Sequence, residues 1–424
     1  MSGSDALSIA LTLTKKESLT PRLATLSKLY NQKNQLLDEA IVLYFKNPHS
    51  FTGEDIVEFQ CHGGLIVAEM ILSSILESGA RLASPGEFSK RAVINGRMDL
   101  TKAEATAKLI ETKSIDAALI LTKQLRGDLA GFVNSLRDSL VEILAFVEVN
   151  IDYAEEDLPL DLLVQIEEKL KANASLLEKS VQASQSREGL LNGFKVSIIG
   201  KPNVGKSSLL NALLSYNRAI ISDIAGTTRD TIEEEIKIGT HLVKIVDTAG
   251  IRDAKETIEK IGIERSIDAI EESEIVIALF DGSCPKDDDD QKIIALIERY
   301  KDEKEIIVAI NKKDLPQKFD AQYLNDALHI SSKEDTTLVT EKLKTYLDSQ
   351  SLEDEIILIS KRQVQATQQA LEAINEAREL LSFGELELFA FHINEAIENI
   401  SSITKSFQRD EILDKMFSSF CLGK

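Results

Sequence analysis

The chain has 424 residues, of which 43% are hydrophobic and 28% charged, and its formal net charge is −21 at pH 7. This length suggests roughly two to four domains. So acidic a chain is a poor nonspecific binder of nucleic acid, because phosphate contacts need local positive charge. No apolar run approaches membrane-spanning length, and Met1–Ala10 lacks a signal pattern, so we expect a cytoplasmic protein without a membrane partner.

Residues 1–95 are expected to form a small α/β domain. Ile41–Phe45 is a short apolar run, turn residues follow it, and Ile56–Phe59 resumes a strand pattern. After Gly63 and Gly64 a helix is expected, with apolar residues on one face.

Helical periodicity begins near Thr101, where the apolar residues recur at steps of three and four. They are Leu125, Leu129, Phe132, Leu136, Leu140, Ile143 and Val147. A second amphipathic stretch covers residues 162–186. From Phe194 to about residue 345 short apolar strands alternate with helices, which predicts a parallel doubly wound sheet. Beyond residue 355 two helical stripes return, with Gly384 as a turn between them.

The cysteines and the longest acidic run indicate no disulfide framework and no metal site. Cys61, Cys284 and Cys421 are far apart and odd in number, which argues against a disulfide framework or a zinc site. The run Asp287–Asp290 is interpreted as a solvated loop.

The segment Gly200–Ser207 matches the P-loop pattern, between a predicted strand and a predicted helix at Ser208–Leu214. Its glycines let backbone amides face phosphates, and the helix N-terminus favours anions. We expect Lys206 to reach the β- and γ-phosphates and Ser207 to bind Mg²⁺.

Further motifs follow the later strands, and together with the P-loop they indicate a GTPase. Asp247–Gly250 is placed for the Mg²⁺ shell and the γ-phosphate, and Gly226–Asp230 resembles a first switch in which Thr228 contacts both. In Asn311–Asp314, the carboxylate of Asp314 matches the hydrogen-bonding edge of guanine and not that of adenine. The predicted nucleotide-binding residues are Asn203, Val204, Gly205, Lys206, Ser207, Ser208, Thr227, Thr228, Asp247, Gly250, Asn311, Lys312, Asp314, Ser331, Ser332 and Lys333, with Ser207 and Thr228 as Mg²⁺ ligands.

These motifs set the predicted architecture. The fold class is α/β plus all-α: a Ras-like P-loop GTPase inserted into a discontinuous helical domain, preceded by the small α/β domain. The expected domains are residues 1–95, residues 96–190 as the first helical part, residues 191–348 as the G domain, and residues 349–424 as the second helical part.

The water-positioning glutamine of Ras-like GTPases has no equivalent here, because Ile251 occupies that position. Arg252 and Glu259 are the candidates for replacing it, with Glu256 and Glu264 weaker. By spacing alone, an exposed switch-region charge is the better explanation of each of them.

Together with these motifs, several blocks resemble the MnmE/TrmE family of bacterial tRNA-modifying GTPases over nearly the whole chain. The blocks are Ser50–Asp55, Cys61–Gly64, Pro85–Ala92, Asn95–Leu100 and the terminus Phe420–Lys424. That terminus distinguishes the family from other P-loop GTPases.

The resemblance assigns roles to residues that the patterns alone leave open. It implies a K⁺ site made by Asn203, the carbonyls of Ser222 and Ile224, and Thr227, and it adds Ser222 to the nucleotide-binding set. It also implies that Glu259 positions water and that Arg252 is the switch arginine. Finally, it implies that Glu58, Arg97 and Lys424 help to bind a formyl-tetrahydrofolate-type cofactor. It also implies that the thiol of Cys421 lies near the modification site. By the residues alone, a strand-face carboxylate, surface cations and a buried thiol are the favoured explanations of these four.

The implied activity is K⁺-dependent GTP hydrolysis coupled to modification of the wobble uridine of certain tRNAs. The family acts as a homodimer and as a heterotetramer with the flavoprotein MnmG (GidA). It installs an aminomethyl or carboxymethylaminomethyl group at uridine C5, with a 5-formyl- or methylene-tetrahydrofolate derivative, GTP, Mg²⁺ and K⁺ as cofactors. Two alternatives stay open: an Era- or EngA-like ribosome-assembly GTPase, and a GTP-driven scaffold without tRNA chemistry of its own.

The sequence departs from the family pattern in two places. Met1–Leu7 resembles a point inside the family's N-terminal domain, so we expect its first strands, with a folate-contacting arginine, to be absent. Unpaired strand edges would then weaken the pocket and dimerisation. Ile403–Phe407 also differs from the expected Gly-Glu pair, and nothing in the sequence explains that change.

Overall fold

The structure is a computed structural model that describes residues 1–152, 160–217, 234–246, 259–322, 324, 326–350, 355–405 and 417. For residues 149–152, 160–161, 216–217, 259–265 and 382 it describes the backbone alone. The described residues fall into two compact units, one of residues 1–110, 123–178 and 360–424, the other of residues 111–122 and 179–359. No helix in these ranges combines the length and the apolar character needed to cross a lipid bilayer.

The N-terminal part of the first unit is a three-stranded antiparallel sheet in the order β1-β2-β3. Its elements are α1 (Ala6–Thr14), β1 (Thr25–Tyr30), β2 (Leu36–Phe45), β3 (Ile56–Gln60) and α2 (Leu65–Glu77). Buried side chains of α1 and α2, among them Leu13 and Ile71, pack with Leu29, Val42 and Val57 of the sheet. The predicted strand, turn, strand and helix are confirmed, and α1 and β1 add to them.

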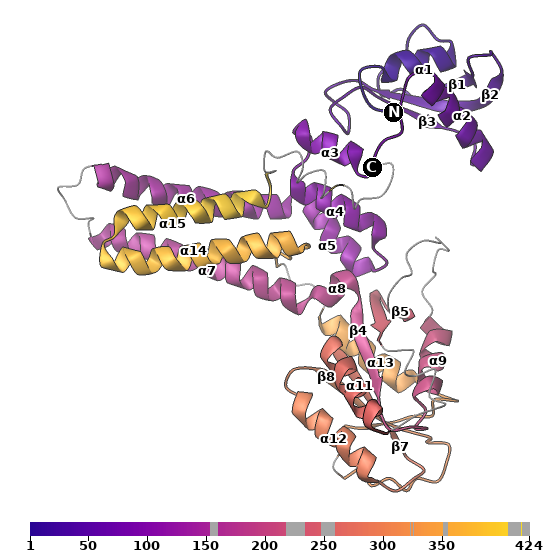
Figure 1. Ribbon diagram of the computed structural model, residues 1–424, viewed down its shortest axis with the longest axis vertical. Helices are drawn as coiled ribbons and strands as arrows, with labels where there is room; N and C mark the ends of the chain where they lie inside the picture. Colours follow the sequence, from indigo (N-terminus) through magenta and orange to yellow (C-terminus); the bar gives the residue numbers. More distant parts are fainter. Residues whose placement is uncertain are drawn as a thin grey trace. The chain divides into compact units, whose positions relative to one another are not determined.

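Helices make up the rest of the first unit. They are α3 (Glu87–Ile94), α4 (Leu100–Glu111), α5 (Ile115–Arg126), α6 (Asp128–Asp152), α7 (Leu160–Ser186), α14 (Lys361–Phe383) and α15 (Leu386–Ser402), of which α4, α5 and α7 also have residues in the second unit. Helices α6, α7, α14 and α15 run side by side (Figure 1). The predicted turn is confirmed, because Gly384 ends α14 with φ 75°, a left-handed conformation that suits glycine.

An ion pair between a buried carboxylate and a partly exposed arginine joins the two helical segments across the chain. The Glu104 carboxylate in α4 accepts from Nε and Nη2 of Arg362 at 2.8 and 2.9 Å and from Gln363 Nε2 at 2.6 Å. Arg362 also donates to the Ser402 and Ile403 carbonyls at the end of α15, which lack helical partners of their own. The expectation that the flanking helices form one discontinuous domain is therefore confirmed.

The second unit contains a six-stranded sheet in the order β5-β6-β4-β7-β8-β9. Its elements are α8 (Glu188–Asn192), β4 (Phe194–Ile199), α9 (Lys206–Asn217), β5 (Glu234–Ile238), β6 (His241–Ile245), α11 (Glu259–Glu272), β7 (Ile275–Asp281), α12 (Asp288–Tyr300), β8 (Glu305–Asn311), β9 (Leu328–His329) and α13 (Thr337–Ser349). Every pairing is parallel except that of the edge strand β5 with β6. The doubly wound sheet is confirmed, and its antiparallel edge is a refinement that alternation alone does not predict. Because β4, β7 and β8 are adjacent, the loops after their carboxyl ends meet, which is where such sheets bind ligands.

Candidate functional site: a phosphate loop and a base-reading loop

The phosphate loop connects β4 to α9 and depends on two glycines. Gly200 has φ 150°, and a Cβ there would lie 2.4 Å from the Leu279 carbonyl oxygen of β7. Gly205 has φ 108°, and a Cβ there would lie 2.2 Å from Asn311 Nδ2. Both positions therefore exclude any side chain, for reasons of backbone conformation and of space.

Lys206 begins α9 with an ammonium group that is mostly buried. Its Nζ donates to the carbonyl oxygens of Gly200 at 2.6 Å and Lys201 at 2.9 Å. Burial lowers the pKa of Lys206, because its charge is removed from water. A phosphate group beside it, at the N-terminus of α9, would offset this cost.

Asn311, the last residue of β8, ties the phosphate loop to two other loops. Its Nδ2 donates to the Val204 carbonyl at 2.7 Å, and its Oδ1 accepts from the Ser332 amide at 2.8 Å. Asn311 and Ser332 are buried, so both bonds form away from water. Predicted residues from three separate motifs are thereby brought together.

Asp314 lies exposed next to this junction, where a guanine base would be read. One carboxylate oxygen, Oδ1, accepts from Ser331 Oγ at 2.9 Å, which orients the group. The remaining acceptor sites can take the N1–H and amino group of guanine. Lys333, in the same loop, is exposed.

Lys312 has a left-handed backbone, with φ 64°, and its Nζ lies 2.5 Å from Asp281 Oδ2 at the end of β7. Burial alone would raise the pKa of Asp281, but the hydrogen bonds from Lys312 and Ser283 hold that pKa below its usual value. Asp281 was not predicted. A carboxylate directly after a buried strand was the signal that could have identified it.

The interpretation of Asp287–Asp290 as a solvated loop was wrong. Asp287 is the N-cap of α12 in a capping box with Asp290, which is 1% exposed. Lys201 of the phosphate loop lies 2.6 Å from Asp287 Oδ2 and 2.7 Å from Asp290 Oδ2. The acidic run therefore anchors the phosphate loop, a role that only the sheet topology decides.

The remaining predicted residues of this site are described in part or not at all. Asn203 has φ 64° and an exposed side chain, and Ser207 and Ser208 lie in the first turn of α9, Ser208 exposed. Glu259 begins α11, and its side chain is not described. Nine of the predicted site residues lie outside the described residues: Ser222, Ile224, Thr227, Thr228, Asp247, Gly250, Arg252, Cys421 and Lys424.

The second candidate region is a cavity of about 960 Å³ in the N-terminal part. Its walls include apolar side chains such as Phe59, Ile71 and Ile75, and Glu58 of β3 lines it. Arg97 is not among the lining residues; its Nε donates to the Ser50 carbonyl at 3.0 Å. Glu58 therefore lines this cavity, whereas Arg97 does not.

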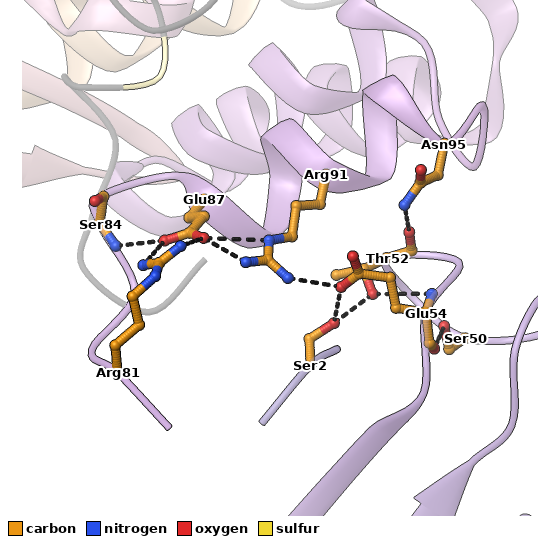
Figure 2. Close-up of polar contacts among 9 residues, drawn as sticks. All are labelled: Ser2, Ser50, Thr52, Glu54, Arg81, Ser84, Glu87, Arg91 and Asn95. Atoms are coloured by element: carbon orange, nitrogen blue, oxygen red, sulfur yellow. Dashed lines mark hydrogen bonds and ion pairs between the residues drawn. The ribbon is translucent and has the colours of Figure 1, made fainter. Parts of the chain in front are cut away.

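A chain of alternating charges borders this cavity (Figure 2). Arg81 and Arg91 both contact Glu87, at 2.5 and 2.7 Å, and Arg91 also lies 2.8 Å from Glu54. Glu54 in turn accepts from Ser2 Oγ at 2.8 Å. The hydrogen bond from Arg81 is the largest of the effects that lower the pKa of Glu87 to about 2, and burial opposes it.

Two family models match the chain. The model of the MnmE helical domain matches residues 100–421, and that of the N-terminus of the GTP-binding protein TrmE matches residues 1–97.

Curated relatives match over the full length of the chain. The tRNA modification GTPase MnmE of a Nitratiruptor species is 60% identical and that of Aliarcobacter butzleri 56%, each over 100% of this chain and over 94% and 95% of the relative. A solved structure of Era in complex with MgGDPNP and a segment of 16S ribosomal RNA is 25% identical, over 42% of this chain and 66% of that chain. Its TM-score of 0.26 is too low to carry an argument about function.

Replacing Gly205 with alanine is expected to weaken nucleotide binding about tenfold to a hundredfold. The new methyl group would displace Asn311 Nδ2, and strain at an unfavourable φ costs on the order of 1–3 kcal/mol. Gly239→Ala is the matched control, since Gly239 has φ 62° but the nearest atom that a Cβ there would meet among the described residues is Lys344 Cε, at 3.5 Å. Titration with a fluorescent guanine nucleotide measures both; equal affinities for the two variants would contradict the close approach at Gly205.

The Glu87 network predicts a pH-dependent contribution to stability. Because the folded pKa of Glu87 is about 2, below the usual 4.5, its contribution is complete above pH 4.5 and is lost as the pH falls towards 2. Glu87→Gln is expected to lower the free energy of unfolding by about 1–3 kcal/mol at pH 7, and the difference should shrink on acidification. The chain has no tryptophan, so urea unfolding can be followed through one introduced at Phe59. Glu77→Gln, at an exposed position of α2, is the control; a difference independent of pH would refute the ion-pair account.

Proposed function

We propose, since the chain belongs to the family of MnmE tRNA modification GTPases, that it hydrolyses GTP to drive modification of tRNA. One observation carries the nucleotide part of this proposal: the Asn311 side chain joins the phosphate loop at Val204 to the loop of Ser332, beside Asp314. We propose that the chain is divided into domains of residues 1–95, 96–190, 191–348 and 349–424. We also propose that the protein lies in the cytoplasm, where tRNA is found.

Binding of the triphosphate would use backbone amides and one cation, which suits a chain of net charge −21. The amides of the glycine loop and the first turn of α9 face the phosphates, and Lys206 exchanges carbonyl contacts for phosphate oxygens. The hydroxyl of Ser207, in that first turn, is the kind of oxygen ligand that Mg²⁺ prefers. When bound, Mg²⁺ supplies charge neutralisation at the β- and γ-phosphates.

We propose that residues in and just before α11 position the water that attacks GTP. Ile251 cannot orient water, so we assign this role to Glu259, at the start of α11, with Arg252 as the switch arginine. In the same proposal K⁺ is held by Asn203, Ser222, Ile224 and Thr227 and supplies the positive charge of an arginine finger. The exposed side chain of Asn203 on a left-handed backbone is consistent with such a ligand.

The tRNA chemistry would need partners and a one-carbon donor. We propose a homodimer that works with MnmG on C5 of the wobble uridine, with a tetrahydrofolate derivative near Glu58, Arg97 and Lys424 and with Cys421 near the modified base. Binding of folate to the purified chain would separate this enzyme from a scaffold that leaves all tRNA chemistry to its partner.

Nucleotide and cation specificity test the central proposal. Hydrolysis of GTP should exceed that of ATP and should be faster in K⁺ than in Na⁺, measured as phosphate release with and without the flavoprotein partner. Asp314→Asn should weaken GTP binding by about tenfold to a hundredfold, because the two guanine donors lose a charged acceptor. Lys313→Ala, at the neighbouring exposed position, serves as control. Equal use of ATP would refute guanine specificity, whereas equal rates in both salts would refute only the K⁺ site.

Glu259→Ala is expected to keep GTP affinity while losing most turnover, about a hundredfold or more, because a residue that acts on water contributes in the transition state. Glu272→Ala changes an exposed carboxylate on the same helix and should leave turnover unchanged. Single-turnover hydrolysis with pre-bound GTP separates binding from chemistry. If turnover survived in Glu259→Ala, the role would pass to another residue.

A further inference from the structure

The hairpin of α14 and α15 brings three potential metal ligands together, outside every motif described above. Glu376 lies on α14, and His392 and Glu395 lie on α15, separated by one helical turn. Glu376 and His392 lie equally far from the turn residue Gly384, one before it and one after it. The antiparallel helices therefore place them at the same level.

Their ligand atoms converge at the spacing of a coordination sphere. His392 Nδ1 lies 3.0 Å from Glu376 Oε2 and 3.4 Å from Glu395 Oε2, and all three ligand atoms lie within 4.8 Å of one another. Nitrogen and oxygen ligands about 2.1 Å from one ion are about 3.0 Å apart at 90° and about 3.4 Å apart at the tetrahedral angle. The two measured distances match these values.

The imidazole nitrogen at the centre of this group lacks a hydrogen bond. Nδ1 of His392 is buried and has no partner with hydrogen-bond geometry, although two carboxylate oxygens lie close to it. A proton on Nδ1 would favour one carboxylate in line with the N–H bond. A neutral Nδ1 would present its lone pair to two negative charges, which is unfavourable unless a cation lies between them.

The ligand types select the class of ion. One imidazole nitrogen and two carboxylates suit Zn²⁺ and similar divalent transition metals, whereas Mg²⁺ and Ca²⁺ prefer oxygen alone. The two carboxylates would neutralise the ion, and their side chains are 60% and 49% exposed, so water can complete the coordination. The Phe391 ring meets the imidazole edge to face at 5.2 Å, which helps to fix its orientation.

We propose that Glu376, His392 and Glu395 form a binding site for a divalent transition-metal ion, with Zn²⁺ as the best fit, that clamps α14 to α15. The ion would bridge two helices at a site in the first unit, whereas the phosphate loop lies in the second. Metal binding at this site can therefore be measured separately from Mg²⁺ binding at the nucleotide site.

The test is a titration of the tag-free full-length chain, reduced and without nucleotide, with Zn²⁺ in competition with a fluorescent zinc indicator. One ion per chain is expected, and His392→Gln and Glu376→Gln should each weaken its binding at least about tenfold. Glu376 is exposed, so its isosteric replacement leaves the fold intact, and far-ultraviolet circular dichroism verifies this for both variants.

His62→Gln is the matched control, because His62 Nδ1 contacts one carboxylate, that of Asp38 at 2.8 Å, instead of two. It should bind Zn²⁺ as tightly as the unaltered chain. Substitution with Co²⁺ adds a spectroscopic readout: visible bands without a thiolate-to-cobalt charge-transfer band are expected. A thiolate band would assign the ion to a cysteine site. Either that band or unchanged affinity in both α14–α15 variants would overturn the proposal.

Discussion

The Asn311 side chain donates to the Val204 carbonyl and accepts from the Ser332 amide, so one buried amide holds three loops of the sheet edge together. The close approach that allows this requires glycine at position 205, because any Cβ there would collide with Asn311 Nδ2. The shape of the phosphate loop and the position of Asp314 therefore depend on the same pair of hydrogen bonds. The loops to which we assign phosphate and base binding are thus joined by hydrogen bonds before any ligand binds.

Charges around the nucleotide site are divided between structural and ligand-binding roles. Lys201 and Lys312 are both held by carboxylates, those of α12 and of Asp281, and so serve as anchors of the loops. Lys206 instead rests on neutral carbonyl oxygens, and burial lowers its pKa. In the proposed site, Lys206 and backbone amides would provide the favourable charge for a triphosphate in this strongly acidic chain.

The helical domain depends on a second interaction, between residues 258 positions apart. Arg362, which is partly exposed, joins the buried Glu104 to the end of α15, and removal of Arg362 would leave the Glu104 carboxylate buried without its cation. The GTPase segment is therefore an insertion between two helical segments of the chain that are joined to each other. Such an insertion is the arrangement expected if movement in the G domain is to act on the domain that carries it.

Sequence by itself determined the elements and the chemistry of the nucleotide motifs. Period and turn residues identified the helices near 128–152 and 361–383 and the strands around the P-loop, and the order of motifs identified a GTPase. Tertiary structure alone decided what lies opposite each residue: that Asp290 is buried against Lys201, that Asp281 holds Lys312, and that the Arg97 side chain donates to the Ser50 carbonyl. The reason is physical. Periodicity and motif spacing are local properties of a chain, whereas partners for buried charges are chosen by strand order, which brings together residues that no local pattern relates.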